Sequence, residues 1–182
     1  MAHVCRSRFP TLALPSPRAE GGRQVSAGRI QVGDRFPFFT LPDQDGKPFN
    51  LDEALSQGAV VLFFYPKDDT AGCTREVCSF RDASADFASA GAVVAGISSD
   101  DTASHRQFAS KHQLAYPLLS DAGGKLRRQV GVPRAMFGLV EGRVTYVLDR
   151  DGIVRHCFDS MVGATKHVGE ALTTLRALGS RP

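Results

Sequence analysis

The feature that most constrains the fold is an unbroken apolar run, AVVLFFY at residues 59–65, which ends at Pro66. Apolar side chains at both odd and even positions predict a strand buried on both faces, as in the middle of a sheet covered by helices. Residues 92–97, AVVAGI, repeat this pattern. Both runs are far shorter than the ~20 apolar residues that cross a bilayer, so we expect no membrane contact.

Segments with helical spacing follow these strands. After the first run, Val77, Phe80 and Phe87 recur at helical intervals, and Gly91 lies where a C-terminal cap belongs. Near the C-terminus one helical stripe consists of Val168, Ala171, Leu172, Leu175 and Leu178. Strands that alternate with helices predict an α/β fold, with helices on both faces of a central sheet.

The connections between these segments are also readable. Asp-Gly pairs at 45–46 and 151–152 predict two hairpins, and the second of them makes the sheet mixed rather than all-parallel. Asp100 or Asp101 is expected to cap a helix over residues 102–113. Residues 116–133 are expected to form a loop, a short helix and a second loop.

The net charge of +3 is located in the first 30 residues, which hold five arginines and one acid. The rest of the chain is close to neutral, so it has no electrostatic footprint for nucleic acid. The arginine-rich leader fits either an organelle transit peptide or an extension without structure. We therefore divide the chain into a leader, residues 1–30, and one domain, residues 31–182. The expected compartment is the cytoplasm, or the plastid if the leader is a transit peptide.

The cysteines do not predict a disulfide scaffold. There are four in 182 residues, Cys5, Cys73, Cys78 and Cys157, and no secretory signal precedes them. The five histidines show no paired metal spacing, so we expect no metal site. Cys5 and Cys157 have no role that the sequence assigns.

Cys73 lies where a helix should begin, just past the carboxyl end of a buried strand. In α/β sheets this edge carries the reactive crevice. The start of a helix stabilises an anion, and only the thiolate is a nucleophile. Thr70 is placed to hydrogen-bond near the sulfur, and Pro66 ends the strand. We expect a reactive Cys73 open to solvent; the alternative is a buried, inert cysteine.

Cys78 is five residues further along the same helix. In an intact helix such residues are about 8–9 Å apart between Cα atoms and point some 140° apart. A disulfide needs Cα atoms within about 7 Å. The two thiols can therefore bond only if part of the helix unwinds, which predicts a conformational switch. The alternative is that Cys78 simply packs in the core near Phe80.

Glu76 lies one turn from Cys73, and a carboxylate there would disfavour a thiolate unless a cation lies between them. Arg143 is the expected cation, because a guanidinium stays charged and its fork of donors can hold both a thiolate and a substrate oxygen. Arg134 is the rival. For either arginine the alternative is an ordinary exposed surface residue.

Taken together, these residues resemble a known signature. Pro66-x-x-x-Thr70-x-x-Cys73, with a buried strand before it and Glu76 after it, is similar to the active-site motif of peroxiredoxins. CTREVC at residues 73–78 resembles the variant in which the resolving cysteine follows five positions later, the peroxiredoxin Q or bacterioferritin comigratory protein group. The resemblance continues through residues 131–154 and covers roughly residues 31–178.

The resemblance implies a thioredoxin-like fold and a peroxidase that reduces hydrogen peroxide and organic hydroperoxides. It makes Cys73 the peroxidatic and Cys78 the resolving cysteine, joined after oxidation in an intramolecular disulfide. Thr70, Pro66 and Arg143 match the positions that shape the peroxide pocket. It further implies a monomer, recycled by thioredoxin or a similar dithiol, with no cofactor.

Two other functions use the same thiols. A general thiol-disulfide oxidoreductase shares the fold but normally has a Cys-x-x-Cys pair, which is narrower than the spacing here. A redox sensor without turnover would change partners when its helix unwinds. The peroxidase is preferred because it alone also uses Pro66, Thr70 and Arg143.

Overall fold

The computed structural model describes residues 28–135 and 139–179. The predicted leader, residues 1–30, falls outside this part of the chain except for its last three residues. Of these, Ile30 is buried in the core, and its N–H donates to the Val130 carbonyl at 3.1 Å. Arg29 forms an ion pair with Asp159 at 2.9 Å.

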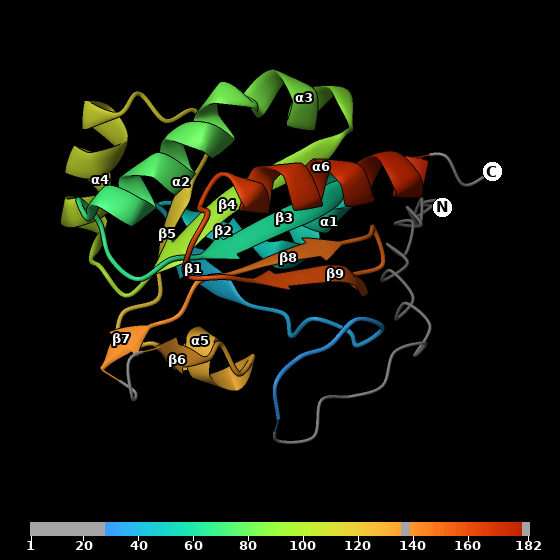
Figure 1. Ribbon diagram of the computed structural model, residues 1–182, viewed down its shortest axis with the longest axis horizontal. Coiled ribbons are helices and arrows are strands. Elements are labelled where there is room, and N and C mark those ends of the chain that lie inside the picture. Colours follow the sequence, from blue (N-terminus) through green and yellow to red (C-terminus); the bar gives the residue numbers. More distant parts are fainter. Residues whose placement is uncertain (1–27, 136–138, 180–182) are drawn as a thin grey trace, which may run out of the picture.

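The centre of the fold is a mixed sheet with the strand order β5-β4-β3-β8-β9 (Figure 1). The apolar run of the sequence forms its middle strand, β3 (Ala59–Phe64). On one side β3 pairs in parallel with β4 (Ala92–Ser98), which pairs in parallel with β5 (Leu118–Ser120). On the other side β8 (Val144–Leu148) is antiparallel to both β3 and β9 (Val154–Asp159). The predicted mixed sheet is confirmed.

Both predicted hairpins are present. β1 (Thr40–Pro42) pairs with β2 (Pro48–Asn50) across the Asp45-Gly46 turn, and β8 joins β9 across Asp151-Gly152. The two glycines have φ of 78° and 75°, a conformation that favours glycine. The Asp-Gly pairs therefore predicted both hairpin connections correctly.

Helices cover both faces of the sheet, as the sequence predicted. One face carries α2 (Ala71–Asp82), α3 (Ser84–Ser89), α4 (Thr102–Lys111) and α6 (Lys166–Gly179), the group drawn above the sheet in Figure 1. The other face packs against α1 (Leu51–Gln57) and α5 (Lys125–Gln129). The β-strands thus separate two hydrophobic cores.

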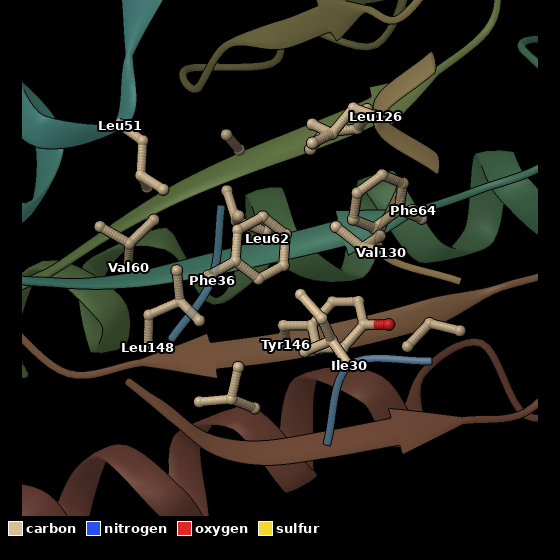
Figure 2. Packing of buried hydrophobic residues seen from close by; sticks show 14 of the residues in the cluster. Ile30, Phe36, Leu51, Val60, Leu62, Phe64, Leu126, Val130, Tyr146 and Leu148 are labelled. Carbon is tan, nitrogen blue, oxygen red and sulfur yellow. The ribbon is translucent and has the colours of Figure 1, made fainter. Parts of the chain in front are cut away.

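The core under α1 and α5 appears in Figure 2, where side chains of β3 and β8 meet Phe36, Leu51 and Leu126. The opposite core contains the predicted C-terminal stripe, with Ala171 and Leu175 buried and Leu178 at its edge. The edge-on contact of Phe36 with Tyr146, at 5.4 Å between ring centroids, is typical of aromatic packing.

The structure corrects three predictions of detail. The helix expected to run from Cys73 to Gly91 is broken at Ala83 into α2 and α3. The segment 116–133 was predicted without a strand, yet it contains β5, whose three residues are too few to show a period. A short hairpin of β6 (Arg134–Ala135) and β7 (Val140–Glu141) was also missed.

Asp101 caps α4 by accepting from the Ser104 N–H at 2.8 Å, as predicted for one of the two aspartates. Asp100 has another role, described below. Within the described residues, no helix has the length and apolarity that a bilayer crossing requires.

Candidate active site

The site begins where β3 ends. Tyr65 continues the strand, and its carbonyl accepts from Nη2 of the buried Arg127 at 2.6 Å. The same guanidinium donates to the Gly142 carbonyl at 2.9 Å, next to Arg143. Arg127 thus ties the end of β3 to the start of β8. Its pKa is lowered by burial, against the opposing effect of Glu141.

The loop from Pro66 to α2 is held by a buried aspartate. The Asp68 carboxylate accepts from the Tyr65 hydroxyl at 2.7 Å and from Ser104 at 2.8 Å, and it lies 2.9 Å from Nδ1 of His105. Burial acts to raise the pKa of Asp68, but these partners outweigh it and the net shift is downward. The Asp68 N–H in turn donates to the Asp100 carboxylate at 2.9 Å.

Asp69 completes the turn with a φ of 56°, in the left-handed region that non-glycine residues seldom adopt. Its carboxylate lies 2.6 Å from the Lys111 ammonium at the end of α4. Both aspartates therefore fasten the loop to α4, so that α2 starts at a fixed position.

Cys73 occupies the first turn of α2, as predicted. Its burial differs from the prediction of a thiol open to solvent, because only 1% of the residue is exposed. The residues directly before it are more accessible: Thr70 and Ala71 are exposed and Gly72 is half-buried. Cys73 is therefore buried directly after a segment that is open to solvent.

Cys73 belongs to the hydrophobic core on the α2 side of the sheet, but its sulfur also has a charged neighbour. Nη2 of Arg143 lies 3.4 Å from its sulfur, and Nη1 of the same guanidinium donates to Oε2 of Glu76. All three side chains are buried. The predicted cation between thiol and carboxylate is thus Arg143. The rival, Arg134, is exposed on β6.

Glu76 is the buried acid of this group. Burial raises its pKa to about 8, although Arg143 acts in the opposite direction. Its second oxygen, Oε1, lies 3.6 Å from Nδ1 of His167 on α6 and has no hydrogen-bond partner among the described residues. Glu76 therefore links the start of α2 to both β8 and α6.

His167 is itself fully buried and held at both ring nitrogens. Nδ1 lies 2.8 Å from the Thr145 hydroxyl, and Nε2 lies 3.0 Å from the Ser160 carbonyl. Burial lowers the pKa of His167 to about 4. It is therefore a neutral imidazole at neutral pH, and it adds no second cation beside Glu76.

Two more predicted residues, Thr70 and Pro66, lie in the segment that leads to Cys73, and the hydrogen bond predicted for Thr70 near the sulfur goes to the backbone instead. Thr70 is the N-terminal flanking residue of α2, but its hydroxyl donates to the Lys67 carbonyl at 3.1 Å and makes no side-chain cap. Pro66 is half-buried at the beginning of the loop. At Gly72, an added Cβ would lie 3.2 Å from Nη2 of Arg143, so the missing side chain leaves room for the guanidinium.

Cys78 lies on the same unbroken helix, and both thiols are free. The structure therefore represents the reduced state, in which helix geometry keeps the two sulfurs apart. Cys78 is half-buried, and its sulfur contacts Nδ1 of His112 at 3.8 Å rather than only apolar atoms.

Cys157 is on β9, remote in the fold from α2. Its thiol lies 3.9 Å from Nη2 of Arg29, and burial raises its pKa despite this cation. Cys5 lies outside the described residues. No group of three or more candidate metal ligands occurs in the described part of the chain.

Sequence reasoning missed the groups that support the site, namely His167, Arg127, Asp68 and His112. His167 directly precedes the apolar stripe of α6, and Arg127 sits in a basic stretch that resembles a solvated helix. A polar residue beside an apolar stripe is a weak signal. Only the fold shows which of such residues are buried.

With this geometry described, similarity to known proteins can be assessed. The sequence profile of the AhpC/TSA family matches residues 32–157. Chloroplastic peroxiredoxin Q of Oryza sativa subsp. japonica is 45% identical over 166 residues, which are 91% of this chain and 75% of the rice protein. The Arabidopsis thaliana protein of the same name is 48% identical over 149 residues, or 82% of this chain and 68% of that protein.

Solved structures agree. Peroxidoxin BcpB of Mycobacterium tuberculosis superposes with a TM-score of 0.78 at 42% identity, over 85% of this chain and all of that one. Peroxiredoxin Q of Xanthomonas campestris gives 0.69 at 33% identity, over 76% of this chain and 90% of that one. The fold is therefore thioredoxin-like, and the chain belongs to the AhpC/TSA family, within its peroxiredoxin Q group.

Proposed function

We propose that this protein is a thiol-dependent peroxidase that reduces hydrogen peroxide and organic hydroperoxides at Cys73. The observation that carries this proposal is the Arg143 guanidinium, which contacts the Cys73 sulfur at the start of α2 while it is held by Glu76. A cation fixed in a buried site stabilises a thiolate and also the charge that develops on a peroxide oxygen. Reduction of alkyl peroxides by the Xanthomonas campestris bacterioferritin comigratory protein supports the substrate class.

In the first step the Cys73 thiolate attacks one peroxide oxygen. The O–O bond breaks, water or an alcohol leaves, and Cys73 becomes a sulfenic acid. Arg143 orients the peroxide through the N–H group that faces the Cys73 sulfur, since its other terminal nitrogen is bound to Glu76. The N–H groups of the first helical turn add further donors. Because Cys73 is only 1% exposed, peroxide reaches the sulfur only when the chain around it moves, and the exposed Thr70 and Ala71 at the start of α2 are the side from which we expect it to enter.

In the second step Cys78 attacks the sulfenic sulfur to form a disulfide. The step requires α2 to open between the two cysteines, since an intact helix holds them too far apart. Oxidation removes the thiolate charge that Arg143 stabilises, which weakens one of the contacts that hold the first turn in place. Opening is therefore favoured after peroxide has reacted.

Two cysteine variants test this proposal. Cys73→Ser should abolish peroxide consumption, whereas Cys78→Ser should consume one equivalent and then fail to cycle with a dithiol. Cys157→Ser is the matched control, because its thiol lies on β9 and contacts Arg29. Full turnover by Cys73→Ser would refute the proposal. Stoichiometric oxidation of the unaltered protein without recycling would favour a redox sensor instead.

The reductant is a dithiol protein of the thioredoxin class, because an intramolecular disulfide needs two electrons from an exchanging thiol pair. One chain supplies Cys73, Cys78 and Arg143, so the reaction requires no residue from a second copy, and a monomer is sufficient. Peroxide loss driven by thioredoxin, against insulin-disulfide reduction as the competing activity, separates this enzyme from a general oxidoreductase. Sedimentation of the reduced and oxidised protein measures the oligomeric state.

The plastid is the compartment that the relatives favour over the cytoplasm. Peroxiredoxin Q proteins of rice and Arabidopsis that are 45% and 48% identical to this chain are chloroplastic. The arginine-rich residues 1–30 fit a transit peptide in composition. Mass spectrometry of the mature N-terminus in the native host tests this assignment: an intact leader would speak for the cytoplasm.

A further inference from the structure

Cys78 has a neighbour that the peroxidase mechanism has not used. Its sulfur lies 3.8 Å from Nδ1 of His112, the residue that ends α4. A thiol donates one hydrogen and sulfur is a weak acceptor, whereas an unprotonated imidazole nitrogen is a good one. The contact is therefore best satisfied as an S–H group directed at Nδ1.

Three further contacts fix how α2 packs on the end of α4 around the imidazole. Arg81 donates from Nη1 to the His112 carbonyl at 2.8 Å. The His112 ring stands edge-on to Phe108, with centroids 4.9 Å apart and planes at 78°. Tyr116, just beyond α4, donates to the Val77 carbonyl at 2.7 Å, directly before Cys78. The pairing of ring and thiol is thus built into the packing of α2 on α4.

The charged side chains near the pair are themselves paired with acids. Arg81, on the same helix as Cys78, is paired with Asp82 at 2.7 Å, and Lys111 beside His112 is paired with Asp69 at 2.6 Å. Burial raises the pKa of Tyr116 far above its ordinary value, so its phenol stays a neutral donor. Nε2 of His112 has no hydrogen-bond partner among the described residues, which leaves Nδ1 as the nitrogen in use.

We infer that His112 is the general base of the resolution step, a catalytic residue that removes the proton of Cys78. This inference rests on the proposed function, since it needs Cys78 to be the resolving thiol. The Cys78 proton passes to Nδ1 while α2 is intact, and the thiolate attacks the Cys73 sulfenic sulfur once the turn opens. The S–S bond forms, the S–O bond breaks, and the leaving hydroxide takes up a proton from solvent to give water, while the His112 imidazolium returns its proton to solvent. The Cys78 sulfur is oxidised and the sulfenic sulfur is reduced.

The same contact has a purely structural alternative, which makes the opposite prediction. If His112 only packs against Cys78 and holds α2 closed, its replacement should loosen the helix and accelerate disulfide formation. If His112 is the base, replacement should slow disulfide formation. The sign of the change therefore separates the two roles.

The experiment compares the full reduced chain with His112→Gln. Each protein receives one equivalent of hydrogen peroxide, and samples are alkylated and analysed by mass spectrometry over time. His112→Gln should form sulfenic acid at an unchanged rate but the 73–78 disulfide roughly 10- to 100-fold more slowly at neutral pH. The difference should shrink as the pH rises, because hydroxide then replaces the imidazole. With excess peroxide, the variant should accumulate more sulfinic acid at Cys73.

His156→Gln is the matched control, because His156 lies on β9 and pairs with Glu170 at 3.2 Å. If His112→Gln does not fold, His112→Ala with added imidazole gives a second test, and imidazole should restore the disulfide rate. Disulfide formation at or above the unaltered rate in the folded variants would overturn the inference. Absence of a 73–78 disulfide in the unaltered protein would instead overturn the proposed function itself.

Discussion

Nη2 of Arg143 lies 3.4 Å from the Cys73 sulfur, and the other terminal nitrogen of the same guanidinium is bound to Glu76. The cation beside the Cys73 sulfur therefore depends on a buried acid for its position. Since burial raises the pKa of Glu76 to about 8 and Arg143 lies between the two groups, this acid places little negative charge beside the thiol at neutral pH.

Fast oxidation of Cys73 should require the two terminal nitrogens of Arg143, and a positive charge alone should be insufficient. In Arg143→Lys a single ammonium cannot reach both Glu76 and Cys73, so the oxidation of Cys73 should slow by roughly 100-fold. Stopped-flow measurement of peroxide reduction checks this. Arg134→Lys, on the exposed β6, should retain the rate; equal losses in both variants would contradict the assigned role.

Gly72 keeps space open beside the guanidinium. In Gly72→Ala the new Cβ would lie 3.2 Å from Nη2 of Arg143 and displace it by a few tenths of an ångström, so we expect roughly a tenfold slower reaction with peroxide. The helix itself should be no less stable, since alanine is favoured there over glycine. Gly169→Ala in α6, where an added Cβ meets nothing within 4 Å, is the control for helix propensity.

His167 should make the stability of the protein depend on pH. Its pKa is about 4 in the folded state, below its ordinary value of 6.5, so the unfolded chain binds the extra proton between these limits. The contribution of His167 to stability should therefore be full above pH 6.5 and should fall by on the order of 3 kcal/mol as the pH drops to about 4. Urea unfolding at several pH values should show that His167→Gln lacks this part of the slope.

Tyr116 should slow the opening of α2. Tyr116→Phe removes the hydrogen bond to the Val77 carbonyl, at a cost of about 1 kcal/mol, so the opened state should be about fivefold more populated. Disulfide formation should accelerate, and amide hydrogens of α2 should exchange faster. Tyr146→Phe, in the opposite core, should leave both rates unchanged. A slower disulfide in Tyr116→Phe would show that the bond aids resolution instead.

The sequence predicted the central architecture because a few local signals agree. The run 59–65 became β3, the Asp-Gly pairs became turns, and the stripe at 168–178 became the buried face of α6. β5 was missed because its three residues are fixed by pairing with β4, a contact distant in sequence. The break between α2 and α3 at Ala83 was likewise missed, because no glycine or proline marks it in the sequence.

For the site, the sequence predicted the Cys73, Glu76 and Arg143 group, since charge balance required a cation between thiol and carboxylate. It did not predict that Cys73 would be buried, because its burial depends on packing against residues distant in sequence, among them Arg143 and the core of the same face. The supporting residues, His167 above all, come from elements remote in sequence and become visible only when the sheet brings them together.

Arg127 has a consequence for the energetics of turnover. One guanidinium secures the carbonyls at the ends of β3 and of the segment before β8, and neither contact involves α2. The rearrangement can therefore be confined to α2, about three helical turns, while the central sheet keeps its structure. Proteolysis or hydrogen exchange should therefore distinguish oxidised from reduced protein at α2 alone. The central sheet should unfold at the same temperature in both states.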